Sequence, residues 1–113
     1  MKKVEAIIRP ESFQELRDEL ALIGIDGLTV TEAAGIGNQR GKQGVFRGTS
    51  FEVLLVPKLK IEMVVKNERL DEIVDVIIRI CDTGHVGDGK IFVSSVEEVI
   101  RIRTGERGTE AIL

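Results

Sequence analysis

A glycine-rich run in the last third of the chain has the composition of an anion-binding loop. It spans residues 83–93 and reads TGHVGDGKIFV, so three glycines precede Lys90 and an apolar stretch follows it. Glycine has no Cβ, so backbone amides can approach a bulky anion, and successive amides in a turn form an anion-binding concavity. An isoleucine follows the lysine where a Walker A loop has serine or threonine, which excludes that motif. The alternative is a helix that ends at Gly84 and is followed by a tight turn.

Two arginines form a second candidate anion site. Arg101 and Arg103 are two residues apart in a segment, 99–103, with the pattern of a short strand. Side chains at this spacing point to one side of a strand, and two guanidinium groups suit a phosphate between them. The alternative is an exposed edge strand whose arginines pair with nearby glutamates (Glu97, Glu98 or Glu106). Combined with the glycine-rich run and Lys90, the two arginines predict a polyphosphate ligand.

The other candidate residues give weaker signals. Lys58 and Lys60 are two apart at the start of an apolar alternating run, and are either solvated or directed at a ligand. We expect His85 at the surface and Cys81 in the core. The loop expected at residues 35–50 is either merely solvated or suited to an acidic partner surface, because it is basic (Arg40, Lys42 and Arg47). No nucleophile–base pair or carboxylate pair is evident, so the sequence does not favour an enzyme.

Length and composition narrow the class of protein. The 113 residues predict a single domain, 1–113. A net charge of −3 disfavours nucleic-acid binding, and one cysteine with one histidine disfavours a Cys/His metal site. No apolar run approaches the ~20 residues of a membrane span, and no signal peptide is visible. We therefore expect a soluble cytoplasmic protein that does not insert into a membrane.

Hydrophobic periodicity predicts the elements that position these residues. Two helices are expected, one with a capping box at Ser12 and Glu15 and an end at Gly24, the other capped by Asn67 and ending at Gly84. Long mobile segments are expected at residues 35–50 and in the tail after residue 103. Alternating apolar residues predict five strands, at residues 4–9, 27–34, 59–65, 91–93 and 99–103.

The predicted order is β-α-β-β-α-β with a short extra strand. This is the α+β, ferredoxin-like arrangement, an antiparallel sheet with two helices on one face. The opposite face also carries apolar residues, Ile7 and Val64 among them. Because an apolar face left exposed favours self-association, we expect an oligomer.

Five stretches match the motifs of a known family in the same order. They are AIIRP at residues 6–10, GLTVTE at 27–32, PKLKIE at 57–62, T-x-x-x-GDGKIFV at 83–93 and IRIRTGE at 100–106. Through them the chain resembles the PII family of nitrogen-regulatory signal-transduction proteins, nearly from end to end. The resemblance implies a compact homotrimer that binds ATP or ADP in clefts between subunits. With Mg²⁺ and ATP, family members also bind the effector 2-oxoglutarate.

The resemblance also implies roles for three segments. Residues 36–54 would be the T-loop, which changes shape with ligand and docks onto target proteins such as an ammonium transporter or the enzymes and regulators of nitrogen assimilation. Residues 83–90 would be the phosphate loop, and residues 99–113 the C-terminal segment.

Individual site residues follow from the same resemblance. Contacts to the nucleotide phosphates would come from Gly87, Asp88, Gly89, Lys90, Arg101 and Arg103. Adenine and ribose would be surrounded by Ile7, Gly27, Leu28, Thr29, Glu62 and Val64. The cleft would also be lined by Gly35, Gly37 and Asn38. Mg²⁺ would be bound by Gln39. A carboxylate of 2-oxoglutarate would pair with Lys58, helped by the backbone near Gln39, Arg40 and Gly41.

The chain departs from the family pattern at two positions. Phe51 stands where many bacterial members have a tyrosine that is uridylylated, and without the hydroxyl this modification is excluded there. Asn38 stands where many members have an arginine that reaches the phosphates. The first hypothesis is a non-enzymatic regulator of the PII type. The alternatives are a related adenylate-binding regulator that responds to another metabolite, such as bicarbonate, and a very slow ATPase.

Overall fold

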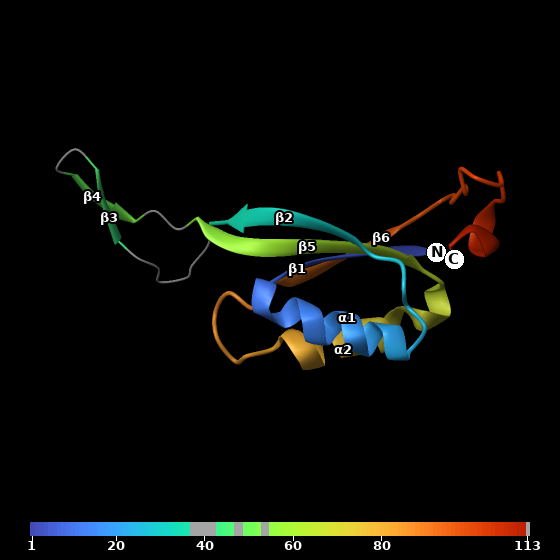
Figure 1. Ribbon diagram of the computed structural model, residues 1–113, viewed down its shortest axis with the longest axis horizontal. Coiled ribbons are helices and arrows are strands. Elements are labelled where there is room, and N and C mark those ends of the chain that lie inside the picture. Colours follow the sequence, from blue (N-terminus) through green and yellow to red (C-terminus); the bar gives the residue numbers. More distant parts are fainter. Residues whose placement is uncertain (37–42, 47–48, 53–54, 113) are drawn as a thin grey trace.

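The computed structural model describes residues 1–36, 43–46, 49–52 and 55–112, with the backbone alone for 43–46 and 49–52. Its main sheet has four antiparallel strands in the order β2-β5-β1-β6. Two helices, α1 and α2, cover one face of this sheet (Figure 1). The strands are β1 (Lys2–Ile8), β2 (Thr29–Gly35), β5 (Val56–Val65) and β6 (Lys90–Ser95), and the helices are α1 (Phe13–Leu22) and α2 (Leu70–Cys81). The ferredoxin-like α+β prediction is confirmed.

The core lies between the sheet and the helices. Alternate residues of β1 and β5 face the helices, because successive side chains of a strand point to opposite faces. The helices contribute residues at helical spacing, which places them on one stripe. The buried side chains are Val4, Ala6, Ile8, Leu16, Leu20, Ile61, Met63, Val65, Ile73, Ile77 and Cys81. Cys81 is therefore a core residue, as predicted.

Ser12 occupies the predicted N-cap position of α1, whereas α2 has Arg69 at this position in place of the predicted Asn67. A 3₁₀ turn precedes each helix, Pro10–Ser12 before α1 and Asn67–Arg69 before α2. The chain thus begins to wind before the helix starts, so Ser12 already has helical backbone angles and Asn67 lies inside a turn. Neither residue makes a capping hydrogen bond through its side chain. Proline favours the first position of a helical turn, and Pro10 occupies it here.

The predicted strand 59–65 begins earlier, and Pro57 lies within β5. Pro57 is paired with Ala34 of β2, whereas β1 ends opposite Leu59. Residues 56–58 therefore have a neighbouring strand on one side only, where the missing proline N–H is tolerated.

The predicted loop contains strands where it is described. β3 (Gln43–Phe46) and β4 (Thr49–Glu52) pair antiparallel as a hairpin. Figure 1 shows the hairpin projecting from the end of the sheet where β2 finishes and β5 begins. This corrects the prediction of a mobile loop for residues 43–46 and 49–50, and Gly35 belongs to β2; residues 37–42 and 47–48 of the predicted loop fall outside the described residues.

The predicted strand at 99–103 does not form. A single bridge joins Ile100 to Arg107, and the chain reverses between them. The reversal is closed by hydrogen bonds from the Gly105 amide to the Arg101 carbonyl, 2.7 Å, and from the Arg101 amide to the Glu106 carbonyl, 2.9 Å. Gly105 has φ of 72°, which an L side chain rarely adopts, so glycine sets the turn. A 3₁₀ turn, Gly108–Ala111, follows and buries Ala111, so part of the tail is structured rather than mobile.

The sheet face opposite the helices mixes apolar side chains with ion pairs. Lys60 lies 3.0 Å from Glu5 and 3.3 Å from Glu62, so it is ion-paired on this face. Ile7 and Val64 alternate with buried core residues and so share this face, as predicted. By its register opposite Glu5, Phe92 belongs to the same face and is 53% exposed. Among the described residues, no helix is long and apolar enough to cross a membrane.

Candidate functional site

The glycine-rich loop between α2 and β6 lies against the end of β1. Gly87 and Gly89 have φ of 102° and 105°, in the region that favours glycine. A Cβ built at Gly89 would lie 1.7 Å from the Ile7 carbonyl oxygen, far inside any allowed contact. Glycine is therefore required at position 89 both by its backbone angles and by the close approach of β1. A glycine loop therefore joins α2 to β6, and Gly84, with φ of 77°, lies in this loop because α2 ends at Cys81; anion binding by the loop stays a prediction.

Two cations hold this loop through its carbonyl groups. Arg9, just after β1, donates from Nη2 to the Val86 carbonyl at 2.8 Å. Lys58 of β5 donates from Nζ to the Gly87 carbonyl at 2.5 Å. The Lys58 residue is only 6% exposed. Burial, and next the nearby Arg9 guanidinium, lower the pKa of Lys58. A buried cation at a glycine turn is a charge that an anionic ligand would meet directly.

Asp88 fastens the loop to the end of α2. Its Oδ1 accepts from Arg9 Nε at 3.1 Å and from the Thr83 hydroxyl, while its Oδ2 accepts from the Thr83 amide at 2.7 Å. These hydrogen bonds, those of Thr83 first and that of Arg9 next, hold the pKa of Asp88 well below its usual range. The loop is thus anchored at both ends of its glycine turn.

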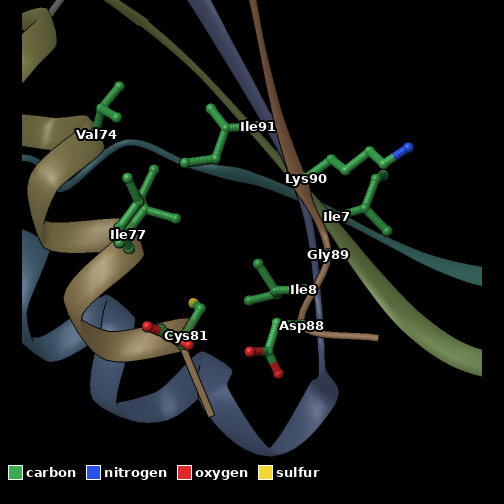
Figure 2. A pocket seen from close by; sticks show the side chains of 11 residues that line it. Ile7, Ile8, Val74, Ile77, Cys81, Asp88, Gly89, Lys90 and Ile91 are labelled. Atoms are coloured by element: carbon green, nitrogen blue, oxygen red, sulfur yellow. The ribbon is translucent and has the colours of Figure 1, made fainter. Parts of the chain in front are cut away.

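Lys90 and Asp88 point to opposite sides of the loop. Figure 2 shows the Lys90 side chain running away from α2 and beside Ile7, while the Asp88 carboxylate lies on the side of Cys81. On that side a cavity of about 410 Å³ separates α2 from β6 and is lined mainly by aliphatic side chains. Burial, followed by the nearby Asp88 charge, raises the pKa of the Cys81 thiol to about 11. Lys90 is exposed, and although it contributes to the cavity lining, its side chain extends beside Ile7 and away from α2 (Figure 2).

Gly35 lies at the same end of the sheet. A Cβ built there would sit 3.5 Å from Cγ of Lys58, an ordinary contact. The ends of β1, β2 and β5 therefore bring together Ile7, Gly35, Lys58 and the loop 87–90.

A separate pocket of about 360 Å³ collects the residues expected around adenine and ribose except Ile7, which lines the cavity between α2 and β6 instead. The separate pocket is lined by Gly27, Leu28, Thr29, Glu62 and Val64, with Lys3, Met63, Val99 and Ile112. Thr29 lies opposite Glu62 in the sheet, and Lys3 makes an ion pair with Glu62 at 3.0 Å. Hydrogen bonds from Lys3 and then Lys60 lower the pKa of Glu62. The pocket combines aliphatic walls with one carboxylate, a suitable lining for a flat, polar-edged ring.

The two arginines are not brought to the glycine loop within one chain. Figure 1 shows the C-terminal segment at the end of the molecule opposite the loop between α2 and β6. Arg101 pairs with the Glu106 carboxylate and donates to the Glu110 carbonyl at 2.8 Å. Arg103 is exposed, and because the strand 99–103 is absent, the two side chains do not share a strand face. In the single chain, Arg101 forms the pair with Glu106 that the sequence offered as the alternative to phosphate binding.

Comparison with known proteins agrees with these features. A family model described as "Nitrogen regulatory protein P-II" matches residues 1–106. The chain belongs to the P-II family. A curated P-II protein of Rhizobium meliloti is 49% identical over 112 residues, covering 99% of this chain and 100% of the relative. A P-II protein of Nostoc punctiforme is 52% identical over the same shares, and one of Rhodospirillum rubrum is 48% identical. The resemblance seen in the sequence is confirmed, and the relatives are named as nitrogen regulatory proteins.

Several P-II site residues predicted from the sequence lie outside the described residues. They are Gly37, Asn38, Gln39, Arg40 and Gly41. Phe51 lies in β4, whose side chains are likewise not described. The predicted Mg²⁺ ligand and the backbone contacts to 2-oxoglutarate therefore stay predictions.

Sequence reasoning missed three contributors to the P-II site. The sequence predicts only that Arg9 ends a strand and that Thr83 belongs to a motif. In the structure both residues form hydrogen bonds that hold the loop. Lys3 is not among the candidate residues of the sequence, yet it pairs with Glu62 and lines the same pocket as Leu28 and Val64. The position of Arg9 before Pro10 is the feature that could have identified it. A proline favours an extended backbone at the preceding residue, and this sets the direction of the Arg9 side chain. His85, by contrast, is exposed as predicted, with Nδ1 3.0 Å from the Thr83 carbonyl oxygen.

Proposed function

We propose that this P-II family protein is a non-enzymatic regulator that binds ATP or ADP and, with Mg²⁺ and ATP, 2-oxoglutarate. The nucleotide would bind in clefts between the subunits of a homotrimer. Targets would be contacted through the T-loop, residues 36–54, and would include an ammonium transporter or proteins of nitrogen assimilation.

One observation carries the proposal for a shared site. The glycine loop 83–90 lies at one end of the sheet, whereas the C-terminal segment, which contains Arg101 and Arg103, lies at the opposite end (Figure 1). A second copy of the chain would bring the arginines of one subunit to the loop of another. Exposed apolar side chains on β6 and the C-terminal segment (Phe92, Val93, Ile100 and Ile102) would then be covered.

The residues present suit an adenine nucleotide in two parts. The pocket with Leu28, Glu62 and Val64 would hold the base, with the Glu62 carboxylate accepting hydrogen bonds from polar groups of the ring or ribose. Lys90 and the amides of the glycine turn would bind phosphates through charge and hydrogen bonds. Mg²⁺, when bound, would neutralise phosphate charge, and Gln39 would ligate it.

Lys58 supports a carboxylate as the second ligand. The Lys58 residue is buried, and its ammonium group donates a hydrogen bond to the Gly87 carbonyl in the free chain. A carboxylate would give this buried cation a stronger partner than a carbonyl oxygen does. ATP and 2-oxoglutarate would move the T-loop by the difference in their affinities for its conformations.

The test is calorimetric titration of 2-oxoglutarate into the protein with Mg²⁺, once with ATP and once with ADP. The proposal expects binding with ATP and none with ADP. Binding of ATP without any binding of 2-oxoglutarate would favour the alternative regulator, which the substitution Asn38 also suggests. Phosphate release that rises linearly with protein and vanishes in Lys90→Ala would instead indicate a slow ATPase.

A further inference from the structure

The two cations beneath the glycine loop bind consecutive peptide groups. Arg9 takes the carbonyl of Val86 and Lys58 takes the carbonyl of Gly87, at 2.8 and 2.5 Å. These carbonyls belong to the peptide units that link residue 86 to 87 and residue 87 to 88. Arg9 follows β1 and Lys58 lies in β5, so two separate segments of the main sheet hold the loop.

The orientation of those carbonyls fixes the orientation of two amides. In a planar trans peptide the C=O and N–H bonds point in opposite directions, and no cis peptide is present among the described residues. Holding the Val86 and Gly87 carbonyls against Arg9 and Lys58 therefore turns the N–H groups of Gly87 and Asp88 away from these cations. Two successive amides on the open side of a glycine turn form a concavity for an anion.

Asp88 and Thr83 keep the Arg9 guanidinium in place. Arg9 Nε donates to Asp88 Oδ1 at 3.1 Å, and the same carboxylate accepts from the hydroxyl and the amide of Thr83. Both carboxylate oxygens are thus engaged by the protein, on the side of the loop that faces Cys81 (Figure 2). The Asp88 carboxylate is consequently placed to orient Arg9, which leaves the backbone amide of Asp88 as its contact to a phosphate.

We infer that Arg9 is a positioning residue for phosphate binding, which acts through the Val86 carbonyl and is itself held by Asp88 and Thr83. The inference rests on the proposed function, because it concerns the same phosphate loop. Under this inference Arg9 contacts no ligand, and it affects the affinity only of ligands that bind the loop amides.

The test compares Arg9→Met with a matched control, Arg79→Met, in which an exposed arginine of α2 loses an ion pair to Glu19. ATP and adenosine are each titrated, ATP by calorimetry and adenosine by nitrogen–proton NMR. Losing one charge-assisted hydrogen bond beneath the loop should weaken ATP about tenfold in Arg9→Met. Adenosine affinity should be unchanged, and Arg79→Met should match the wild type for both ligands. The NMR signals of the Gly87 and Asp88 amides, which ATP shifts in the wild type, should shift less in Arg9→Met.

Two further variants make the result decisive. Thr83→Val removes a hydroxyl bond to Asp88 but leaves Arg9 intact, and should weaken ATP in part, whereas Thr83→Ser should bind normally. If thermal melting shows that Arg9→Met does not fold, the comparison of Thr83→Val with Thr83→Ser tests the inference in its place. Unchanged ATP affinity in Arg9→Met, or an equal loss for ATP and adenosine, would overturn the inference. If the wild type binds no ATP, the proposed function fails, and titration with tripolyphosphate decides the inference separately: binding that Arg9→Met loses supports it, and no binding overturns it.

Discussion

The close approach of Gly89 to β1 predicts a large effect from a single methyl group. In Gly89→Ala the new Cβ would lie 1.7 Å from the Ile7 carbonyl oxygen and 2.8 Å from its carbon, at a φ of 105°. The positive φ alone costs an alanine about 1–2 kcal/mol. Relieving the contact requires the loop to move away from β1, and giving up one hydrogen bond from Arg9 or Lys58 adds about 1.5 kcal/mol or more. We expect a total loss of about 3 kcal/mol in the free energy of unfolding.

Gly84 supplies the matched control. It too has a positive φ, 77°, but a Cβ built there meets no atom within 4 Å. Gly84→Ala should therefore lose about 1 kcal/mol, the cost of the backbone angle less the gain from a stiffer unfolded chain. Urea unfolding of the wild type and both variants, followed by circular dichroism, measures the difference. Equal losses in the two variants would refute the argument that β1 and the loop are in close contact.

Three further predictions concern the core and the loop. Because hydrogen bonds hold the pKa of Asp88 below its unfolded value of about 3.9, Asp88 stabilises the fold above pH 4 and loses this effect as the pH falls further. Urea unfolding at pH 6 and pH 3 should thus show a smaller acid loss in Asp88→Asn than in the wild type; equal losses would contradict the assignment. Cys81, with its thiol pKa raised to about 11 by burial, should resist a thiol reagent at pH 8 in the folded protein and react once urea unfolds it. Rapid reaction of the Cys81 thiol in the folded protein would show that the C-terminal end of α2 opens. Ile73→Ala, at a fully buried position, should lose about 3 kcal/mol of unfolding free energy, whereas Ile78→Ala, half-exposed on the same helix, should lose about 1 kcal/mol or less; similar losses would place the core elsewhere.

The main sheet could be read from the sequence because its signals are local. Apolar alternation in β1 and β5 places one set of side chains toward the helices, and the stripe of α2 matches it. Helix starts were less readable, since Ser12 and Asn67 resemble caps while Pro10 and the 3₁₀ turns decide where winding begins. Whether a residue caps a helix depends on its own backbone angles, and a pattern of residue types does not determine those angles.

The candidate site was predictable in part. The glycine turn and Lys90 are contiguous in the sequence, so their composition alone predicts a glycine loop at this position. Arg9 acts through contacts with residues more than 75 positions away, which no periodicity reveals. The spacing of Arg101 and Arg103 suggested a shared strand face, but Gly105 turns the chain and the strand does not form. The alternating pattern at residues 99–103 is short, and the turn at Gly105 prevents a strand from forming there.

The central claim is that two chains share each nucleotide site, and subunit mixing tests it most directly. Lys90→Ala and Arg103→Ala are prepared separately, and ATP binding of each is measured by calorimetry. Equal amounts are then unfolded together in urea, refolded and measured again. Each pure variant should bind ATP weakly, and the mixture should regain tight binding at about a quarter of its sites, those where an intact lysine meets an intact arginine from the neighbouring chain. No regained binding, or tight binding by either pure variant, would contradict the shared site.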